Sequence, residues 1–333
     1  MHFIIFGAGA VGCYVGGRLA AGGRRVTLVG RPRVIDSLRQ HGLMVSDLDG
    51  FRAQVPARQI TLATSLAHVA MHPDCVVLLC AKGGATEAAA LQISACCPRG
   101  TLVISLQNGV DNLARIAAIA PQMKTLAGMV ACNLVMPAVG HAHRATSGNF
   151  YMERNSVTRE MALLFNACGL ATELADDMRP VQWGKLLLNL NNPVNALSDQ
   201  PLRAQLLDRD YRRVLADLQD EALAVMRRAG ITPARIAAVS PRLMPSLLRL
   251  PNWLFSLVAA RMLRIDAQAR SSMWDDLQRG RITEIDDLCG AVVRLATQVG
   301  VAAPRNAAMC KLVASHHKGI RLSGPELRSA AIQ

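Results

Sequence analysis

The feature that most constrains the fold lies at the start of the chain, where an apolar run, residues 1–6, breaks into a glycine pattern. The pattern is Gly7-Ala8-Gly9-Ala10-Val11-Gly12, and it is followed by helical spacing and a second strand-like run at residues 25–29. In such a pattern the three glycines permit a tight turn, close approach of the backbone to a pyrophosphate, and close helix–strand packing. Phosphates bind the free N–H groups of a helix N-terminus. We therefore predict a dinucleotide site formed by these six residues, and a plain tight turn is the alternative.

Composition indicates a folded globular protein. The 333 residues are enough for about two domains with a sizeable core. Half of the residues are hydrophobic and only 18% are charged, which excludes a disordered chain.

Lys and Arg outnumber Asp and Glu by 37 to 24, so the formal net charge is +13. Such an excess suits nucleic acid, an acidic membrane surface or an anionic small ligand. The basic residues are scattered and aromatic residues make up 4%, whereas a base-stacking surface interleaves the two kinds. We therefore expect a basic solvated surface and no nucleic-acid partner.

Cysteine usage and hydropathy favour a cytoplasmic protein. The nine cysteines are an odd number without a C-x-x-C pair, and no charged segment precedes an apolar one at the N-terminus. The most apolar stretch, residues 243–263, is interrupted by Pro245, Arg249, Pro251, Asn252 and Arg261. It is a poor membrane span and a better buried or interface segment, so we expect no membrane partner, and a homodimer is compatible with it.

The two halves of the chain have different periodicities. The first half alternates strand-like and helix-like segments: a helix at 34–41, a strand pair near 42–55, a strand at 75–81, a helix through 91 and a strand at 101–106. The second half has helical spacing at 181–196, 211–229, 233–238, 244–264, 271–278, 284–299 and 306–317. Pro245 and Pro251 are expected to break the fourth of these segments into pieces. This predicts a doubly wound α/β domain over residues 1–177 and an all-α domain over residues 178–333.

The end of the second strand bears on the choice of cofactor. NAD-specific folds place an acidic residue there for the ribose hydroxyls, but this chain continues Gly30-Arg31-Pro32-Arg33. An arginine can bind a 2′-phosphate through two parallel hydrogen bonds. We predict NADP(H) with Arg31 as the phosphate ligand, and the alternative is that Arg31 and Arg33 are solvated loop cations.

Two polar groups stand out in the helical half. Lys185, Asn189 and Asn192 follow the spacing i, i+4 and i+7 in a leucine-rich helix, where polar groups are costly unless they are paired or face a cleft. We expect them to face a cleft, although a lone lysine is usually a surface charge.

The second polar group lies further on, where Thr283 is a candidate N-cap. For Glu284 two interpretations stay open, a functional carboxylate or one placed favourably at a helix N-terminus.

At this point the chain resembles the ketopantoate reductases (2-dehydropantoate 2-reductases). The matching pieces occur in the family's order over nearly the whole chain: Gly7–Gly12, Lys82 after the run 75–81, Gln107-Asn108-Gly109, Trp183-Gly184-Lys185 with Asn189, and Ser271-Ser272-Met273 with Thr283-Glu284. Together they are far more specific than any one of them.

The resemblance implies a Rossmann-type N-terminal domain, an all-α C-terminal domain and NADPH in the cleft between them. It implies that Lys185 is the general acid for reduction of a ketone, and that Glu284 orients or tunes this lysine and itself lies near the cofactor. Asn189 and Ser272 would hold the substrate. Lys82 and Asn108 would line the cofactor site, with Asn108 near the nicotinamide and so beside the substrate. No metal is required, and His141-Ala142-His143 is expected to lie in a surface loop.

The chain also departs from the family pattern. Family asparagines are replaced by Pro193, Arg203 and Ala269, and Asn192 can fill the first role only through a shift of one residue. The expected reaction is reduction of 2-dehydropantoate to (R)-pantoate for pantothenate biosynthesis. The alternatives are a reductase of the same fold for another 2-oxo acid, or a non-catalytic NADP(H) sensor. The sequence leaves the substrate, the oligomeric state and domain closure open.

Overall fold

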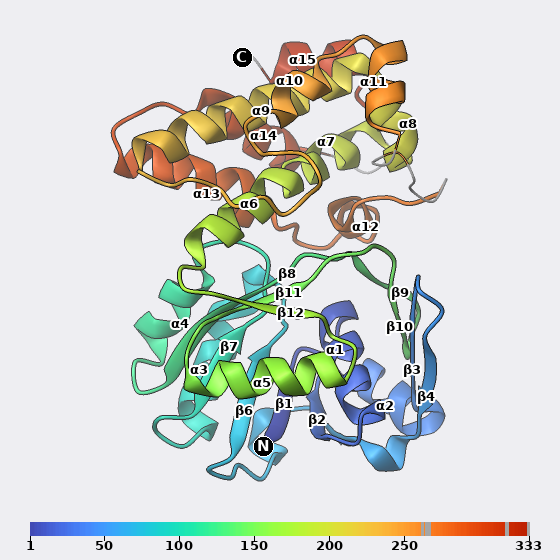
Figure 1. Ribbon diagram of the computed structural model, residues 1–333, viewed down its shortest axis with the longest axis vertical. Helices are drawn as coiled ribbons and strands as arrows, with labels where there is room; N and C mark the ends of the chain where they lie inside the picture. Colours follow the sequence, from blue (N-terminus) through green and yellow to red (C-terminus); the bar gives the residue numbers. More distant parts are fainter. Residues whose placement is uncertain (261–262, 264–267, 317–319, 332–333) are drawn as a thin grey trace. The chain divides into compact units, whose positions relative to one another are not determined.

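The computed structural model describes residues 1–260, 263, 268–316 and 320–331. The chain forms two compact units, Met1–Met178 and Arg179–Gln333, each with its own interior (Figure 1). Among the described residues, no helix is both long enough and apolar enough to span a bilayer.

The first unit contains an eight-stranded sheet in the order β12-β11-β8-β7-β6-β1-β2-β5. Its strands are β1 (His2–Phe6), β2 (Arg25–Val29), β5 (Thr61–Ala63), β6 (Cys75–Leu79), β7 (Leu102–Ser105), β8 (Lys124–Val130), β11 (Phe150–Glu153) and β12 (Thr172–Ala175). The six strands from β5 to β8 are parallel, whereas β11 pairs antiparallel with β8 and parallel with β12. Chain order reverses between the neighbours β1 and β6, so this is the switch point of a doubly wound sheet.

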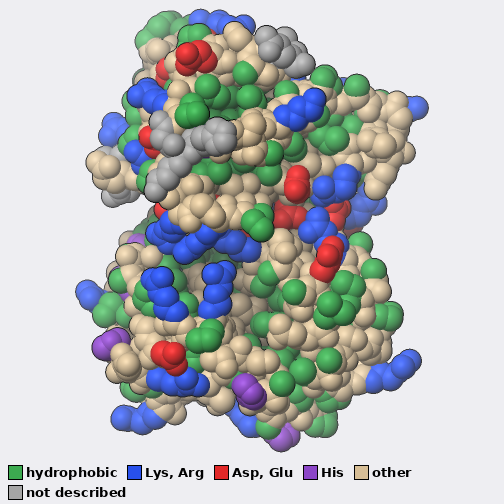
Figure 2. Space-filling view, turned by 180° about the vertical axis from the view of Figure 1, so that it is seen from behind, with side chains coloured by type: hydrophobic (Ala, Val, Ile, Leu, Met, Phe, Trp, Pro, Cys, Tyr) green, Lys and Arg blue, Asp and Glu red, His purple; other side chains and the backbone are tan. Residues whose placement is uncertain are grey.

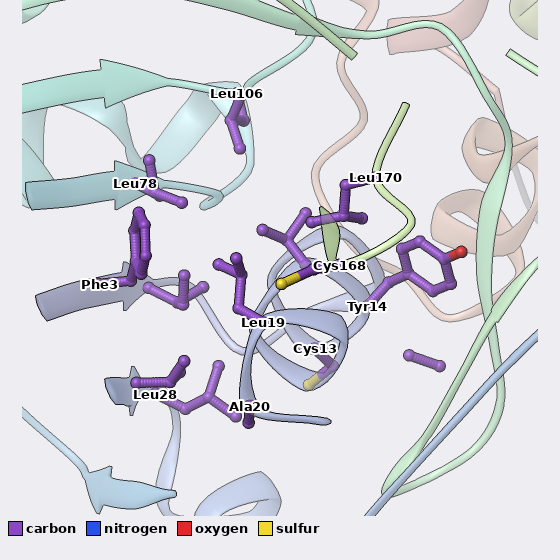
Figure 3. Packing of buried hydrophobic residues seen from close by; sticks show 14 of the residues in the cluster. Phe3, Cys13, Tyr14, Leu19, Ala20, Leu28, Leu78, Leu106, Cys168 and Leu170 are labelled. Carbon is purple, nitrogen blue, oxygen red and sulfur yellow. The ribbon is translucent and has the colours of Figure 1, made fainter. Parts of the chain in front are cut away.

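Helices cover both faces of the sheet (Figure 1). They are α1 (Ala10–Ala21), α2 (Pro32–His41), α3 (Thr86–Cys96), α4 (Asn112–Ile119) and α5 (Ser156–Ala167), with short 3₁₀ turns at Ala57–Gln59, Leu66–His68 and Gly83–Ala85. Successive side chains of β1 point to opposite faces of the sheet and so belong to two separate hydrophobic clusters. Phe3 and Ile5 pack with α1, α2 and α5, and Ile4 packs with α3 and α4. Figure 3 shows the first of these clusters, with Phe3, Leu28 and Leu78 from adjacent strands facing Leu19 of α1.

A second, four-stranded sheet has the order β4-β3-β10-β9. It consists of β3 (Leu43–Asp47), β4 (Arg52–Val55), β9 (Leu134–Ala138) and β10 (His141–Arg144), and the β3–β4 pair is the one predicted near residues 42–55. One of its faces lies against α1. There Arg18 forms a buried ion pair with Asp47 at 3.0 Å and donates to the carbonyl of Cys168.

The described residues of the second unit form helices and no strand. The helices are α6 (Arg179–Asn189), α7 (Asn191–Ser198), α8 (Leu202–Leu207), α9 (Arg209–Arg228), α10 (Met244–Leu248), α11 (Asn252–Val258), α12 (Ser272–Gln278), α13 (Ile285–Gln298), α14 (Pro304–Ala314) and α15 (Gly324–Ala330). The 20-residue α9 is central and contacts α7, α8, α10, α13, α14 and α15. The predicted fold class, a doubly wound α/β unit followed by an all-α unit, is confirmed.

The helix predictions for the second unit are confirmed only in part. Residues 233–238 are not helical, because they lie along α6, where Ala234 donates its N–H to the carbonyl of Pro180 at 2.8 Å. In the segment 244–264 the predicted break at Pro251 is confirmed, because Pro251 separates α10 from α11, whereas Pro245 lies in the first turn of α10 and breaks nothing. Residues 261–262 and 264 lie outside the described part of the chain. His317, predicted to end the helix at 306–317, also lies outside it. The short helices α8 and α15 were not predicted.

Candidate active site

The glycine pattern forms the turn between β1 and α1. Gly7 has φ +119°, and a Cβ there would lie 2.6 Å from the backbone nitrogen of Ala81. A Cβ at Gly12 would lie 2.0 Å from the carbonyl oxygen of Gly7. Backbone atoms on both sides therefore exclude any larger residue, and this turn requires glycine for packing reasons alone.

Gly9 differs from these two glycines because a Cβ there would meet nothing within 4 Å. It is the N-cap residue of the 12-residue helix α1, which has no side-chain cap and no acidic residue in its first turn. Ala10 and Val11 begin that turn, while Ala8 is buried against Gly30. The open space and the uncapped N–H groups fit a phosphate-bearing group such as a dinucleotide pyrophosphate.

Lys82 comes from the strand on the other side of the switch point. β6 ends at Leu79, and the backbone of Cys80 and Ala81 lies directly against Gly7. Lys82 follows with an exposed side chain. Since ligands of doubly wound sheets bind at the carboxyl ends of the strands beside this point, Lys82 and the glycine turn share the expected location.

A buried hydrogen-bond network holds the turns after β6 and β7. Gln107 donates to the carbonyl of Ala81 at 3.0 Å and to the hydroxyl of Thr86 at 2.8 Å. Thr86 donates to the side chain of Asn112, which in turn donates to the carbonyl of Asn108 at 2.6 Å. Gln107 and Asn108 are both in the motif quoted from the sequence, but Thr86 and Asn112, which complete the network, were not predicted, because a pair 26 positions apart leaves no periodic signal.

Two thiols lie buried beside the glycine turn. Burial raises the pKa of Cys13 to about 12. Burial, and to a lesser degree the neighbouring Cys13, also raises the pKa of Cys80. Both thiols are therefore protonated at neutral pH and act as packing groups.

Arg31 lies two residues beyond the end of β2 and directly before α2, and both Arg31 and Arg33 are exposed. This is the position from which an arginine can reach a 2′-phosphate. The face in Figure 2 shows Lys and Arg side chains in several separate groups, with acidic side chains among some of them.

Lys185 and Asn189 lie on α6 with partly exposed side chains, between the buried Gly184, Leu186 and Leu187. The single helix predicted over 181–196 is interrupted at Leu190, and Asn192 belongs to α7.

The interruption has two causes, one local and one from a distant helix. Pro193 has no N–H to donate to the carbonyl of Asn189. The amide of Gln219 donates to the carbonyl of Leu187 at 2.9 Å and so satisfies a group that a continuous helix would use.

The structure brings Asn192 close to the serine pair. Ser271 is buried, accepts from the backbone N–H of Trp274 at 3.2 Å as the N-cap of α12, and donates to the carbonyl of Asn192 at 3.2 Å. Ser272 is the first residue of α12 and is exposed. The first serine thus has a structural contact that joins α7 to α12, and the second presents its hydroxyl at the surface of this unit.

Asn195 is a further asparagine that sequence reasoning missed. It is fully buried, accepts from the N–H of Ser271 at 2.8 Å and donates to the carbonyl of Gln200 at 2.9 Å. These contacts hold the segment before α12, so the side-chain amide of Asn195 helps to fix the positions of Asn192 and Ser272.

Glu284 is partly exposed and takes the N-cap position of α13, which begins at Ile285. The predicted cap by Thr283 is therefore wrong by one residue: it is the Glu284 carbonyl that accepts the backbone N–H of Asp287, at 3.1 Å. Asp286 and Asp287 in the first turn place further negative charge at this N-terminus. Both interpretations of Glu284 remain compatible with this position.

The three departures from the family pattern lie in neighbouring segments. Pro193 is buried in α7, Arg203 is exposed on α8, and the carbonyl of Ala269 accepts the N–H of Leu202 at 2.8 Å. The start of α8 is thereby joined to the chain that leads into α12.

Comparison with known proteins agrees with this architecture. A curated relative from Pyrococcus horikoshii, a 2-dehydropantoate 2-reductase, is 29% identical over 320 residues, covering 94% of this chain and 96% of that protein. A solved PanE/ApbA family ketopantoate reductase from Ralstonia eutropha JMP134 superposes with a TM-score of 0.78 at 29% identity, covering 94% and 97%. A D-mandelate dehydrogenase solved with NADH and anilino(oxo)acetate shares the fold, with a TM-score of 0.77 at 20% identity and coverage of 95% and 98%.

The family models separate along the same two units. The model "Ketopantoate reductase PanE/ApbA" matches residues 3–156, and the model of its C-terminal part matches residues 177–317. Since the two matches span most of the chain, this protein belongs to the ketopantoate reductase family.

Proposed function

We propose that this protein reduces 2-dehydropantoate to (R)-pantoate with NADPH, as a step toward pantothenate. The proposal is supported by family membership over both units and by curated relatives that carry this name. The observation that carries it is Lys185, which is partly exposed on a helix whose neighbouring residues are buried. A proton donor held on a rigid helix suits ketone reduction better than ligand sensing.

Each site residue has a distinct chemical task in this proposal. A bound nicotinamide cofactor supplies the hydride. Lys185 donates its proton to the carbonyl oxygen of the substrate as negative charge develops there. Glu284 keeps the lysine charged and oriented, while Asn189, Asn192 and Ser272 hold the substrate's polar groups.

For the cofactor, the first unit supplies the binding groups. The open space over Gly9 would receive the pyrophosphate, and Lys82 and Asn108, which follow the carboxyl ends of β6 and β7, would line the same site. Arg31 binds the 2′-phosphate. Its exposure at the end of β2, without a carboxylate in the turn that follows, supports a preference for NADPH over NADH.

A second candidate is reduction of a different 2-oxo acid by the same residues. It is favoured by Pro193 and Ala269, which offer no side-chain hydrogen bond where the family pattern has asparagine. A site that binds a substrate hydroxyl rejects analogues that lack it, so kcat/KM over a panel of 2-oxo acids separates the two candidates.

The test follows NADPH absorbance with 2-dehydropantoate for the wild type, Lys185→Ala and Lys124→Ala, where Lys124 is an exposed lysine at the start of β8. We expect kcat to fall by about 10²–10⁴-fold in Lys185→Ala, because general acid catalysis contributes that much. Lys124→Ala should match the wild type. Wild-type rates in Lys185→Ala would remove the proton donor from the proposal. Tight NADPH binding without turnover of any 2-oxo acid would instead favour a sensor.

A further inference from the structure

A cluster of two imidazoles and a hydroxyl lies in the small sheet, away from the glycine turn. Ser46 of β3 is within hydrogen-bond distance of both rings, at 2.7 Å from Nε2 of His141 and 2.8 Å from Nδ1 of His143. The two histidines are two residues apart on β10, so they share one face of the strand. Sequence reasoning expected surface loop residues here.

The backbone holds this arrangement in place. β10 is parallel to β3, with His143 opposite Ser46 and His141 opposite Met44. Ala142, between the histidines, is fully buried, as is Val45 beside Ser46, so the other face of both strands is anchored in the core. All three polar side chains are partly exposed and therefore accessible to small solutes.

We propose that His141 and His143 form a surface binding site for a divalent transition-metal ion of the zinc and copper class, with the Ser46 hydroxyl and water completing the ligand set. Two ring nitrogens already aim at one oxygen atom. In a tetrahedral site with bonds of about 2.0–2.1 Å, neighbouring ligand atoms lie roughly 3.3–3.4 Å apart, so the Ser46 oxygen has to move away from each ring nitrogen by roughly 0.6 Å to admit an ion among the three. Imidazole suits zinc and copper, whereas Mg²⁺ prefers oxygen ligands.

The electrostatic surroundings set the expected strength. Arg52 of β4 pairs with Ser46 across the sheet and is the cation that opposes an ion here. Val135 and Ala138 of β9, opposite the histidines, carry no charge. Among the described residues, no group of three or more His, Cys, Asp or Glu forms a metal site, so this two-imidazole site is a weak one.

The experiment is titration of the full-length protein with Zn²⁺ by calorimetry, with a thermal unfolding curve at each metal concentration. We expect one Zn²⁺ per chain, a rise in Tm that a chelator reverses, and no response to Mg²⁺. His141→Ala and His143→Gln should each weaken Zn²⁺ binding by on the order of tenfold, because one of two imidazole ligands is lost. Arg52→Ala should tighten it, since a nearby positive charge is removed.

His41→Ala is the matched control, because His41 is an exposed histidine at the end of α2. It should bind Zn²⁺ as the wild type does. Unfolding curves without metal show whether each variant is folded. His143→Gln retains a hydrogen-bonding side chain, so it tests the site even if His141→Ala is unstable. Absence of Zn²⁺ binding in the wild type, or wild-type affinity for Zn²⁺ in both histidine variants, would overturn the proposal.

Discussion

Two glycines in the same turn should respond to alanine in opposite ways. At Gly9 the added methyl group meets no atom of the protein within 4 Å, whereas at Gly12 it would lie 2.0 Å from the Gly7 carbonyl oxygen. Gly9→Ala should therefore leave the fold intact and obstruct the cofactor. Gly12→Ala should disturb the fold itself.

The expected magnitudes follow from these contacts. Alanine can adopt the φ of −89° and ψ of −166° found at Gly9. Alanine is a poorer N-cap residue than glycine, but it also lowers the conformational entropy of the unfolded chain, and the two effects roughly cancel. We therefore expect the free energy of unfolding to change by no more than about 0.5 kcal/mol. A methyl group where the backbone must approach a pyrophosphate should weaken NADPH binding by on the order of 10–100-fold. For Gly12→Ala the clash is with backbone, which cannot rotate away, so we expect about 3 kcal/mol of destabilisation, the upper end for overpacking.

The assay is fluorescence titration with NADPH combined with thermal unfolding of both variants. The loss in Gly12→Ala corresponds to a Tm drop of about 6–12 °C for a unit of this size. Wild-type NADPH affinity in Gly9→Ala would refute the assignment of this turn to the pyrophosphate. A wild-type Tm in Gly12→Ala would show that the turn relaxes where we take it to be rigid.

Three further predictions concern other parts of the chain. Arg31→Ala should raise the KM for NADPH and leave that for NADH unchanged, and steady-state kinetics with both cofactors would contradict the phosphate contact if the two KM values moved together. Burial, with a smaller effect of Arg25, lowers the pKa of His2 from 6.5 to about 4, so the unfolded chain binds the extra proton and stability falls as pH drops from about 6.5 to 4. In His2→Gln, denaturant unfolding over this range should show a flatter dependence, and an unchanged slope would refute this role. We also propose that the protein forms a homodimer through the exposed Trp253 of α11. Light scattering should then show a dimer for the wild type and a monomer for Trp253→Ser, and a monomeric wild type would contradict the proposal.

Much of the first unit could be predicted because its signals are local. β1 and β6 are continuous apolar runs, which is how strands covered on both faces appear in sequence. The glycine turn is recognisable because backbone contacts at Gly7 and Gly12 exclude other residues. The helical unit was predicted in kind but not in detail, since Leu190 and residues 233–238 depart from the periodic pattern.

These departures come from partners far away in sequence. Gln219 on α9 reaches the Leu187 carbonyl and Ala234 reaches that of Pro180, and both contacts exist only after the helices have packed. The support of the site has the same origin, because Asn195 holds Ser271 across 76 positions.

The sequence by itself determined the order of elements, the glycine turn and the identity of the residues able to carry the chemistry. Only the tertiary structure decided which polar groups are committed to support and which are exposed. Ser271 and Ser272 illustrate this, since the two are chemically identical neighbours and yet one is a buried cap and the other is open. The physical reason is that a buried polar group must find a hydrogen-bond partner, and packing of the whole unit determines where that partner lies.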